Sequence, residues 1–120
     1  MERVRWREEQ GVRFLLAAYT GATSREALEV LEEVGRIVEA EPDGAFLVTD
    51  VRGTDLDRAW VSRGKSITMT VFEPRQTRIA LLGVTEFQRL ALTGMQRLGK
   101  GRRLRPVSTL DEAVAWFASA

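Results

Sequence analysis

Five consecutive residues, Asp50-Val51-Arg52-Gly53-Thr54, bring together the side chains of this chain that are best suited to chemistry. They follow the short apolar run 45–49, which is typical of a central parallel strand covered on both faces. Open α/β sheets bind ligands outside the carboxyl ends of their strands, and a helix N-terminus there can hold an anion or a phosphate. An arginine adds a bidentate clamp. The pattern predicts a loop formed by Asp50, Arg52, Gly53 and Thr54 that binds an anion or a phosphate. The alternative is that Asp50 and Thr54 only cap backbone groups, which the frequency of such caps favours.

A basic segment near the C-terminus is the second candidate site. It places five cations in nine residues without an acid, namely Arg97, Lys100, Arg102, Arg103 and Arg105. One interpretation is an anion-binding surface for an acidic partner or acidic lipid headgroups. The other is a helix C-terminus whose dipole favours cations, followed by an edge strand protected by charge. No aromatic residue interleaves the cluster, so we do not expect a nucleic-acid partner.

A third candidate is an apolar pocket for a lipid or another small ligand, lined by Trp60, Met69 and Phe72. Stripes at helical spacing more often belong to the protein core, and that interpretation is favoured. Trp116 lies off the apolar stripe of the last expected helix. It is expected either to contact a second copy of the chain or to cover the edge of the sheet.

The composition excludes several classes of chemistry. The chain has no Cys and no His, which excludes disulfides, thiolate nucleophiles and Ser–His–Asp or Cys–His catalysis. Zinc sites become improbable because only carboxylates remain as ligands. We therefore expect no cofactor and no enzymatic activity. No apolar run approaches the length of a membrane span and no signal peptide is evident, so a cytoplasmic location is expected. Residues 1–50 carry 11 acids and 6 basic residues, whereas residues 51–120 carry 6 acids and 12 basic residues.

The elements that must position these residues begin at a repeated local signal. A threonine is followed three residues later by a carboxylate or an amide, the spacing of a helix capping box. The pairs are Thr23–Glu26, Thr54–Asp57, Thr85–Gln88 and Thr109–Glu112. Each predicts the start of a helix.

Strand-like runs alternate with these helices. An N-terminal hairpin over residues 4–8 and 12–19, strands at 45–49, 79–84 and 103–107, and the four helices give the order ββαβαβαβα. Repeated strand–helix–strand units indicate a parallel arrangement, so we expect one α/β domain over residues 1–120 with about five strands and four helices. Residues 67–72 fit either the end of the second helix or a strand, because β-branched residues dominate them.

Several segments resemble the STAS superfamily, in particular its SpoIIAA-like branch of small bacterial proteins of uncharacterised function. The resembling segments are residues 46–53, residues 78–83 and the close of the chain over residues 105–117. The resemblance implies an open mixed sheet with helices and non-enzymatic roles. In the family these are phosphorylation-regulated partner switching and, in relatives that resemble the CRAL-TRIO group, binding of apolar or lipid ligands.

The resemblance also bears on the loop at Asp50. The anti-sigma antagonists of the family accept phosphate on a serine in an Asp-x-Ser loop at a helix start. In the matching loop the residue two positions after Asp50 is Arg52, and Thr54 is the nearest hydroxyl. The expectation is a non-enzymatic regulatory or protein-interaction module that forms a homodimer or binds a protein partner. The alternative is a carrier or sensor of a lipid-like or other small apolar or anionic ligand.

Overall fold

A mixed five-stranded sheet with strand order β1-β2-β3-β4-β5 forms the centre of the computed structural model. The structure describes residues 2–54, 56–84 and 103–119. β1 pairs with β2 in antiparallel orientation, and the remaining pairs are parallel. The strands are β1 (Val4–Glu9), β2 (Val12–Ala18), β3 (Phe46–Asp50), β4 (Arg78–Leu82) and β5 (Leu104–Val107).

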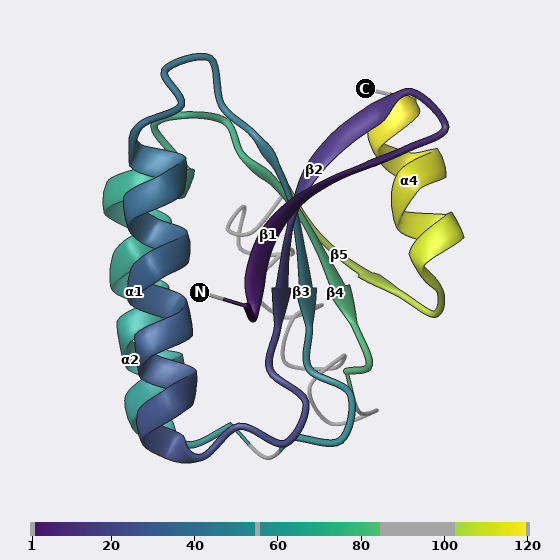
Figure 1. The fold of residues 1–120 in the computed structure, drawn as a ribbon. Coiled ribbons are helices and arrows are strands. Elements are labelled where there is room, and N and C mark those ends of the chain that lie inside the picture. Colours follow the sequence, from purple (N-terminus) through teal and green to yellow (C-terminus); the bar gives the residue numbers. More distant parts are fainter. Residues whose placement is uncertain (1, 55, 85–102, 120) are drawn as a thin grey trace.

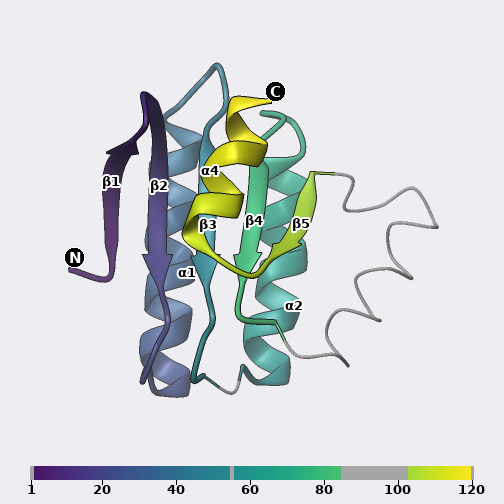
Figure 2. The ribbon, with the colours of Figure 1, turned by 90° about the vertical axis from the view of Figure 1, so that its right-hand side faces the viewer.

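Helices cover both faces of this sheet. α1 and α2 lie against one face, and α4 lies against the other (Figure 1; Figure 2). Their bounds are α1 (Ser24–Glu39), α2 (Arg58–Ile67), continued by a π-helix (Thr68–Phe72), and α4 (Leu110–Ala118). Within the described ranges, no helix combines the length and the apolar character that a membrane span requires.

The central strands are buried on both faces, as their continuous apolar runs predict. In β3, Leu47 joins the core under α1 and α2, whereas Val48 joins the core under α4. In β4, Ile79 and Ala80 divide in the same way. Successive side chains of a strand point to opposite faces, so a strand with no polar position needs a cover on each side. The strand–helix alternation is confirmed in this coarse α/β form.

The N-terminal hairpin and the first helix are confirmed. Gln10 and Gly11 form the hairpin turn with positive φ angles of 52° and 79°. The N-cap of α1 is Thr23, whose hydroxyl accepts a hydrogen bond from the Glu26 backbone nitrogen at 3.2 Å. The Glu26 carboxylate in turn accepts from the Thr23 backbone nitrogen at 3.0 Å, which completes the expected capping box.

The predicted start of the second helix is wrong by several residues. α2 begins at Arg58, and its N-cap is Asp57, whose carboxylate accepts a hydrogen bond from the Trp60 backbone nitrogen at 2.9 Å. The Thr54 hydroxyl instead donates to the carbonyl of Tyr19 at 2.6 Å. Both residues of the Thr54–Asp57 pair are good caps, and the tertiary contact of Thr54 leaves Asp57 to cap the helix.

Residues 67–72 are helical, which excludes the strand alternative. α2 passes directly into the π-helix, and the chain leaves it at Glu73 before Pro74. The hydroxyls of Thr68 and Thr70 donate to the carbonyls of Gly64 and Ser66 at 2.7 and 2.9 Å. These bonds to the carbonyl four residues back satisfy the two hydroxyls within the helical backbone, although they slightly destabilise a helix.

Part of the predicted C-terminal half falls outside the described residues. The helix expected from Thr85 lies there, so the expected number of four helices is not tested. The final helix is confirmed, with Thr109 as its N-cap accepting from the Glu112 backbone nitrogen at 3.1 Å. β5 lies at one edge of the described sheet, as Pro106 predicts.

Two glycines are expected to respond in opposite directions to alanine. A Cβ at Gly64 in α2 would meet no atom within 4 Å, so Gly64→Ala should raise the free energy of unfolding by about 0.5–1 kcal/mol. Gly44 has a φ of +83°, and a Cβ there would lie 2.2 Å from the Arg75 carbonyl oxygen. Gly44→Ala should therefore destabilise the fold. Urea unfolding of both variants measures this, and a stabilised Gly44→Ala protein would contradict the packing.

Candidate functional site

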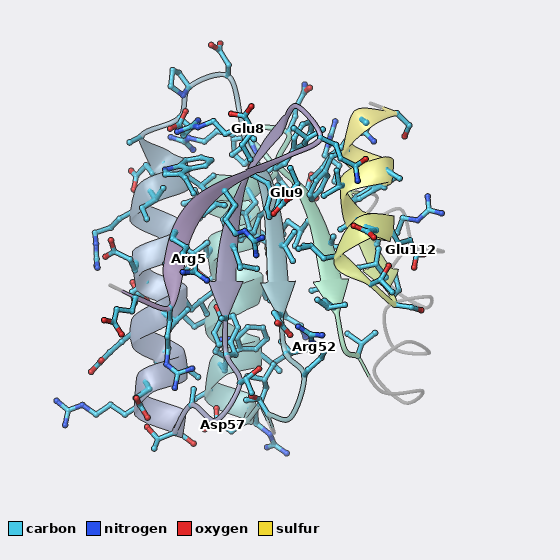
Figure 3. All side chains as sticks on the ribbon, turned by 45° about the vertical axis from the view of Figure 1, so that its right-hand side comes forward. Arg5, Glu8, Glu9, Arg52, Asp57 and Glu112 are labelled. Atoms are coloured by element: carbon cyan, nitrogen blue, oxygen red, sulfur yellow. The ribbon has the colours of Figure 1, made fainter. Side chains whose placement is uncertain are left out.

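The predicted loop at Asp50 lies at the carboxyl edge of the parallel strands. β2, β3 and β4 run in the same direction, so the segments that follow them meet at one edge of the sheet. Figure 3 shows Arg52 and Asp57 beyond the carboxyl ends of these strands, with Asp57 at the start of α2. We call residues 50–54 the Arg52 loop. The topology thus places the four predicted site residues, Asp50, Arg52, Gly53 and Thr54, which are neighbours in the sequence, at this edge.

Asp50 organises the Arg52 loop from a buried position. Its side chain is only 10% exposed, and one carboxylate oxygen accepts hydrogen bonds from the Arg52 backbone nitrogen at 3.1 Å and from Nε at 3.0 Å. The other oxygen accepts from Nη2 at 2.8 Å. This bidentate pairing raises the pKa of the Arg52 guanidinium. The side chain of Arg52 remains 62% exposed. The clamp that the sequence predicts therefore holds the protein's own carboxylate.

Two threonine hydroxyls tie the Arg52 loop to the segment that follows β2. Thr20 donates to the Arg52 carbonyl at 2.8 Å, and Thr54 donates to the Tyr19 carbonyl at 2.6 Å. Arg3 supports the same segment, because its Nη1 donates to the Thr20 carbonyl at 2.8 Å. The Arg52 loop and the segment after β2 therefore each donate a hydrogen bond to the other. These bonds hold the backbone that carries the exposed Arg52 guanidinium.

The segment after β4 packs against the other side of the Arg52 loop. Gly83 has a φ of +93°, and a Cβ there would lie 2.3 Å from the Arg52 Cγ and 2.9 Å from its Cα. The Val51 backbone nitrogen donates to the Leu82 carbonyl at 2.9 Å and extends the pairing of β3 with β4. Only a residue without a side chain allows this approach of the two loops.

Each helix that begins at this edge has a carboxylate that accepts a backbone hydrogen bond at its N-terminus. Glu26 serves α1 and Asp57 serves α2. The hydrogen bond from the Trp60 backbone nitrogen, with a further one from the Ser24 side chain, lowers the pKa of Asp57. Thr54, expected at the second helix start, lies before it, so its hydroxyl is not part of an N-terminal turn. Whether the Arg52 loop binds an anion or accepts phosphate stays a prediction.

The groups at this edge are poorly suited to proton transfer. Tyr19 is 1% exposed, and burial raises the pKa of its phenol more than contact with Trp60 lowers it. The phenol is therefore held in its protonated form. The rings of Tyr19 and Trp60 meet edge to face, with centroids 5.3 Å apart. Among the described residues, no group of three or more acidic side chains is arranged to hold a metal ion.

The expected apolar pocket residues have different surroundings. Phe72 is 4% exposed and belongs to the core under α1 and α2, and Trp60 packs against that core. Met69 is 73% exposed on the π-helix. A surface hollow of about 540 Å³ lies over the outer side of α1, and its lining contains none of these three residues. The structure thus does not bring Trp60, Met69 and Phe72 together around that hollow.

Only part of the expected basic surface can be placed. Arg97, Lys100 and Arg102 lie outside the described residues. Arg103 forms an ion pair with Glu73 at 3.8 Å. The guanidinium of Arg105 lies 5.9 Å from the Trp116 ring, and that of Arg78 lies 5.5 Å from it. Trp116 packs against the core under α4. It covers the sheet at β4 and β5, which was one of its two expected roles.

Sequence reasoning missed Thr20, Gly83 and Arg3. Thr20 follows a strand predicted to run parallel to the strand before Asp50, and Gly83 lies within the predicted strand 79–84 but directly follows β4 in the structure. For Thr20 the position after a strand was the available signal, because parallel strands bring their following residues to one edge. Arg3 gave no local signal, since it reaches the site only through the antiparallel pairing of β1 with β2.

Gly83→Ala should displace the Arg52 loop. The new Cβ would overlap Arg52, so we expect a loss of more than about 1 kcal/mol in the free energy of unfolding and loss of the Asp50–Arg52 bonds. Gly53→Ala is the matched control, because it also has a positive φ but its Cβ would meet only the Thr20 methyl group at 3.8 Å. Urea unfolding and the NMR signal of Arg52 Nε–H measure both effects. Equal signals in the two variants would refute the contact.

Asp57→Asn should remove a pH-dependent part of the stability. The folded-state pKa of Asp57 is lowered, so its charge stabilises the fold above the unfolded pKa of about 4, and this contribution is lost as the pH falls through the folded value. Asparagine keeps a capping oxygen but has no charge. We expect the variant to be less stable than the native protein at pH 7 and the difference to shrink toward pH 3. Urea midpoints across this range test it, and a constant difference would contradict it.

No known family model and no curated protein matches this chain. The resemblance to the STAS superfamily therefore stays a prediction from the sequence. The function is therefore inferred from the geometry of the carboxyl edge.

Proposed function

We propose that this chain is a non-catalytic, STAS-type interaction module that contacts a protein partner through the Arg52 loop. The observation that carries the proposal is the buried carboxylate of Asp50, which fixes an exposed arginine by both of its oxygens. A guanidinium that is already oriented loses little conformational entropy when it meets a partner. Preorganisation of this kind suits recognition.

The hydrogen bonding around the loop supports recognition over catalysis. The hydroxyls of Thr20 and Thr54 donate to backbone carbonyls of the facing segment, and the Tyr19 phenol is buried with a raised pKa. A hydroxyl nucleophile needs a general base to accept its proton, and a backbone carbonyl cannot act as that base. The two threonine hydroxyls instead hold the two loops together, which gives the surface a defined shape.

The chemistry of the surface indicates an acidic partner. Asp50 engages Nε and Nη2 of Arg52, while the side chain as a whole keeps most of its exposure. An arginine held in this way can extend its pairing to a carboxylate on another protein. Because the contact is exposed, its strength should fall with increasing salt.

Affinity capture from a lysate of the native host tests the proposal. The immobilised native protein should retain one or a few proteins that Arg52→Ala retains at least about tenfold less, since an arginine at the centre of an interface often contributes about 2 kcal/mol or more. Quantitative mass spectrometry of the eluates measures the ratio. Because Arg52→Ala leaves the buried Asp50 carboxylate without its side-chain partner, urea unfolding checks its fold, and the double variant Asp50→Asn/Arg52→Ala, which removes the buried charge as well, should show the same loss of capture.

Arg25→Ala is the matched control. The side chain of Arg25 is 91% exposed on α1 and pairs only with Glu29 in the described part of the chain, so its removal takes away the same charge at a different surface. It should leave the captured proteins unchanged. Equal losses in both variants would indicate non-specific charge effects, and no loss in Arg52→Ala would refute the Arg52 loop as the contact surface.

A further inference from the structure

The outer edge of β1 is a second surface that can bind a partner, and it is independent of the Arg52 loop. Among the described strands, β1 pairs only with β2 and forms one end of the sheet. Its six residues pair continuously, without a bulge and without proline. Natural proteins usually protect such an edge by shortening, bending, interrupting or charging it, and of these devices β1 has only the charges. At the other end of the described sheet, β5 has four residues and contains Pro106.

The backbone of β1 presents its hydrogen-bonding groups outward at alternate residues. The Ala18 backbone nitrogen donates to the Arg3 carbonyl at 2.8 Å, which makes Arg3 and Ala18 a hydrogen-bonded pair. Hydrogen-bonded and non-bonded pairs alternate along an antiparallel ladder. Arg5, Arg7 and Glu9 therefore bond to β2, whereas Val4, Trp6 and Glu8 direct their N–H and C=O groups away from the sheet.

The side chains of β1 form two different rows. Val4 and Trp6 belong to the side of the sheet that packs on α1. Arg5, Arg7 and Glu9 lie on the opposite face, where Arg7 forms an ion pair with Glu9. Figure 3 shows Arg5 near the start of β1 and Glu9 near its end. This face of β1 thus carries charges of opposite sign at its two ends.

We propose that two copies of this chain pair antiparallel along β1, around a two-fold axis at Arg7. A two-fold axis perpendicular to the sheet keeps each face on its own side, so it pairs only residues whose numbers have an even sum. An axis at Arg7 places Arg5 of one copy opposite Glu9 of the other, twice. It also makes Trp6 and Glu8 of the two copies exchange their outward backbone hydrogen bonds.

Charge disfavours the register in which the two-fold axis lies at Trp6. An axis at Trp6 would place Arg5 opposite Arg7 of the second copy, so that like charges face each other twice across the interface. An axis at Arg7 brings only the two Arg7 side chains together, and each already pairs with its own Glu9. Directly opposed residues of unlike charge stabilise a strand pair. Charge therefore disfavours the axis at Trp6. An axis at Glu8 would pair Arg7 with Glu9 and leave Arg5 opposite Gly11, so charge reversal at Arg5 distinguishes it from the axis at Arg7.

Hydrogen exchange of the native protein tests the backbone part of the proposal. The amides of Trp6 and Glu8 should exchange fast in dilute solution and become protected as the concentration rises. The amides of Arg5 and Arg7 bond to β2 and should be protected throughout. Sedimentation velocity over the same concentrations should show a reversible dimer. A monomer at every concentration, or protection that does not change with concentration, would overturn the proposal.

Charge reversal tests the register. Arg5→Glu and Glu9→Arg should each weaken self-association by about tenfold or more, because each places like charges opposite each other twice. An equimolar mixture of the two variants should associate again. One variant then presents acids at both positions 5 and 9, the other presents arginines at both, and each acid of the first faces an arginine of the second. Arg25→Glu reverses the charge of an exposed side chain on α1, and this variant should self-associate as strongly as the native protein.

The outcomes separate cleanly. If the Arg5→Glu variant by itself associated as strongly as the native protein, this register would be refuted. An equimolar mixture of Arg5→Glu and Glu9→Arg that stayed monomeric would also refute it. Both variants change exposed or half-exposed side chains of β1, and urea unfolding verifies their fold. Since Arg52 has no part in this edge, the result is independent of the capture experiment with Arg52→Ala.

Discussion

Burial of β3 and β4 on both faces is the constraint from which the rest of this molecule follows. Val48 and Ala80 are fully buried on the side of the sheet that α4 covers. Leu47 and Ile79 are almost fully buried on the other side, under α1 and α2. A sheet with two apolar faces must have helices on each, and helices that connect parallel strands must return the chain to the same edge. Every loop that follows a parallel strand therefore begins at the carboxyl edge. The Arg52 loop lies there because of the core, before any requirement of function acts on it.

A buried carboxylate at the end of such a strand needs partners, and this need shapes the loop. Asp50 is 7% exposed, and an unpaired charge at that depth would strongly destabilise the fold. The Arg52 side chain and backbone nitrogen supply the missing partners, and Gly83 leaves room for the arginine to lie close. Structural and functional interpretations of Asp50 therefore converge. The bonds that satisfy the carboxylate are the same bonds that orient the exposed guanidinium.

Sequence patterns predicted what depends on neighbouring residues and missed what depends on distant ones. The capping box at Thr23 and the cap at Thr109 are local, and both are confirmed. Thr54 has the same spacing to an acid, yet its hydroxyl bonds to Tyr19, 35 residues away, and Asp57 begins the helix. At residues 67–72 the β-branched side chains left two options, and packing of Ile67 and Phe72 in the core decides for the helix. The local pattern placed Asp50 and Arg52 at a strand end, but the contacts of Thr20 and Gly83 with them required the topology.

The two proposed surfaces face different directions because the sheet has both edges and ends. The Arg52 loop occupies the end at which the parallel strands finish, whereas β1 is a lateral edge that runs along the strands (Figure 2). A two-fold axis perpendicular to the sheet reverses the strand direction in the second copy. The Arg52 loops of a β1-paired dimer would consequently point to opposite ends of one continuous sheet. Such a dimer could hold two partners without a clash between them, and binding at one loop would leave the β1 edge unchanged. Avidity would arise in this arrangement only for a partner whose own two binding sites span both ends of the paired sheet.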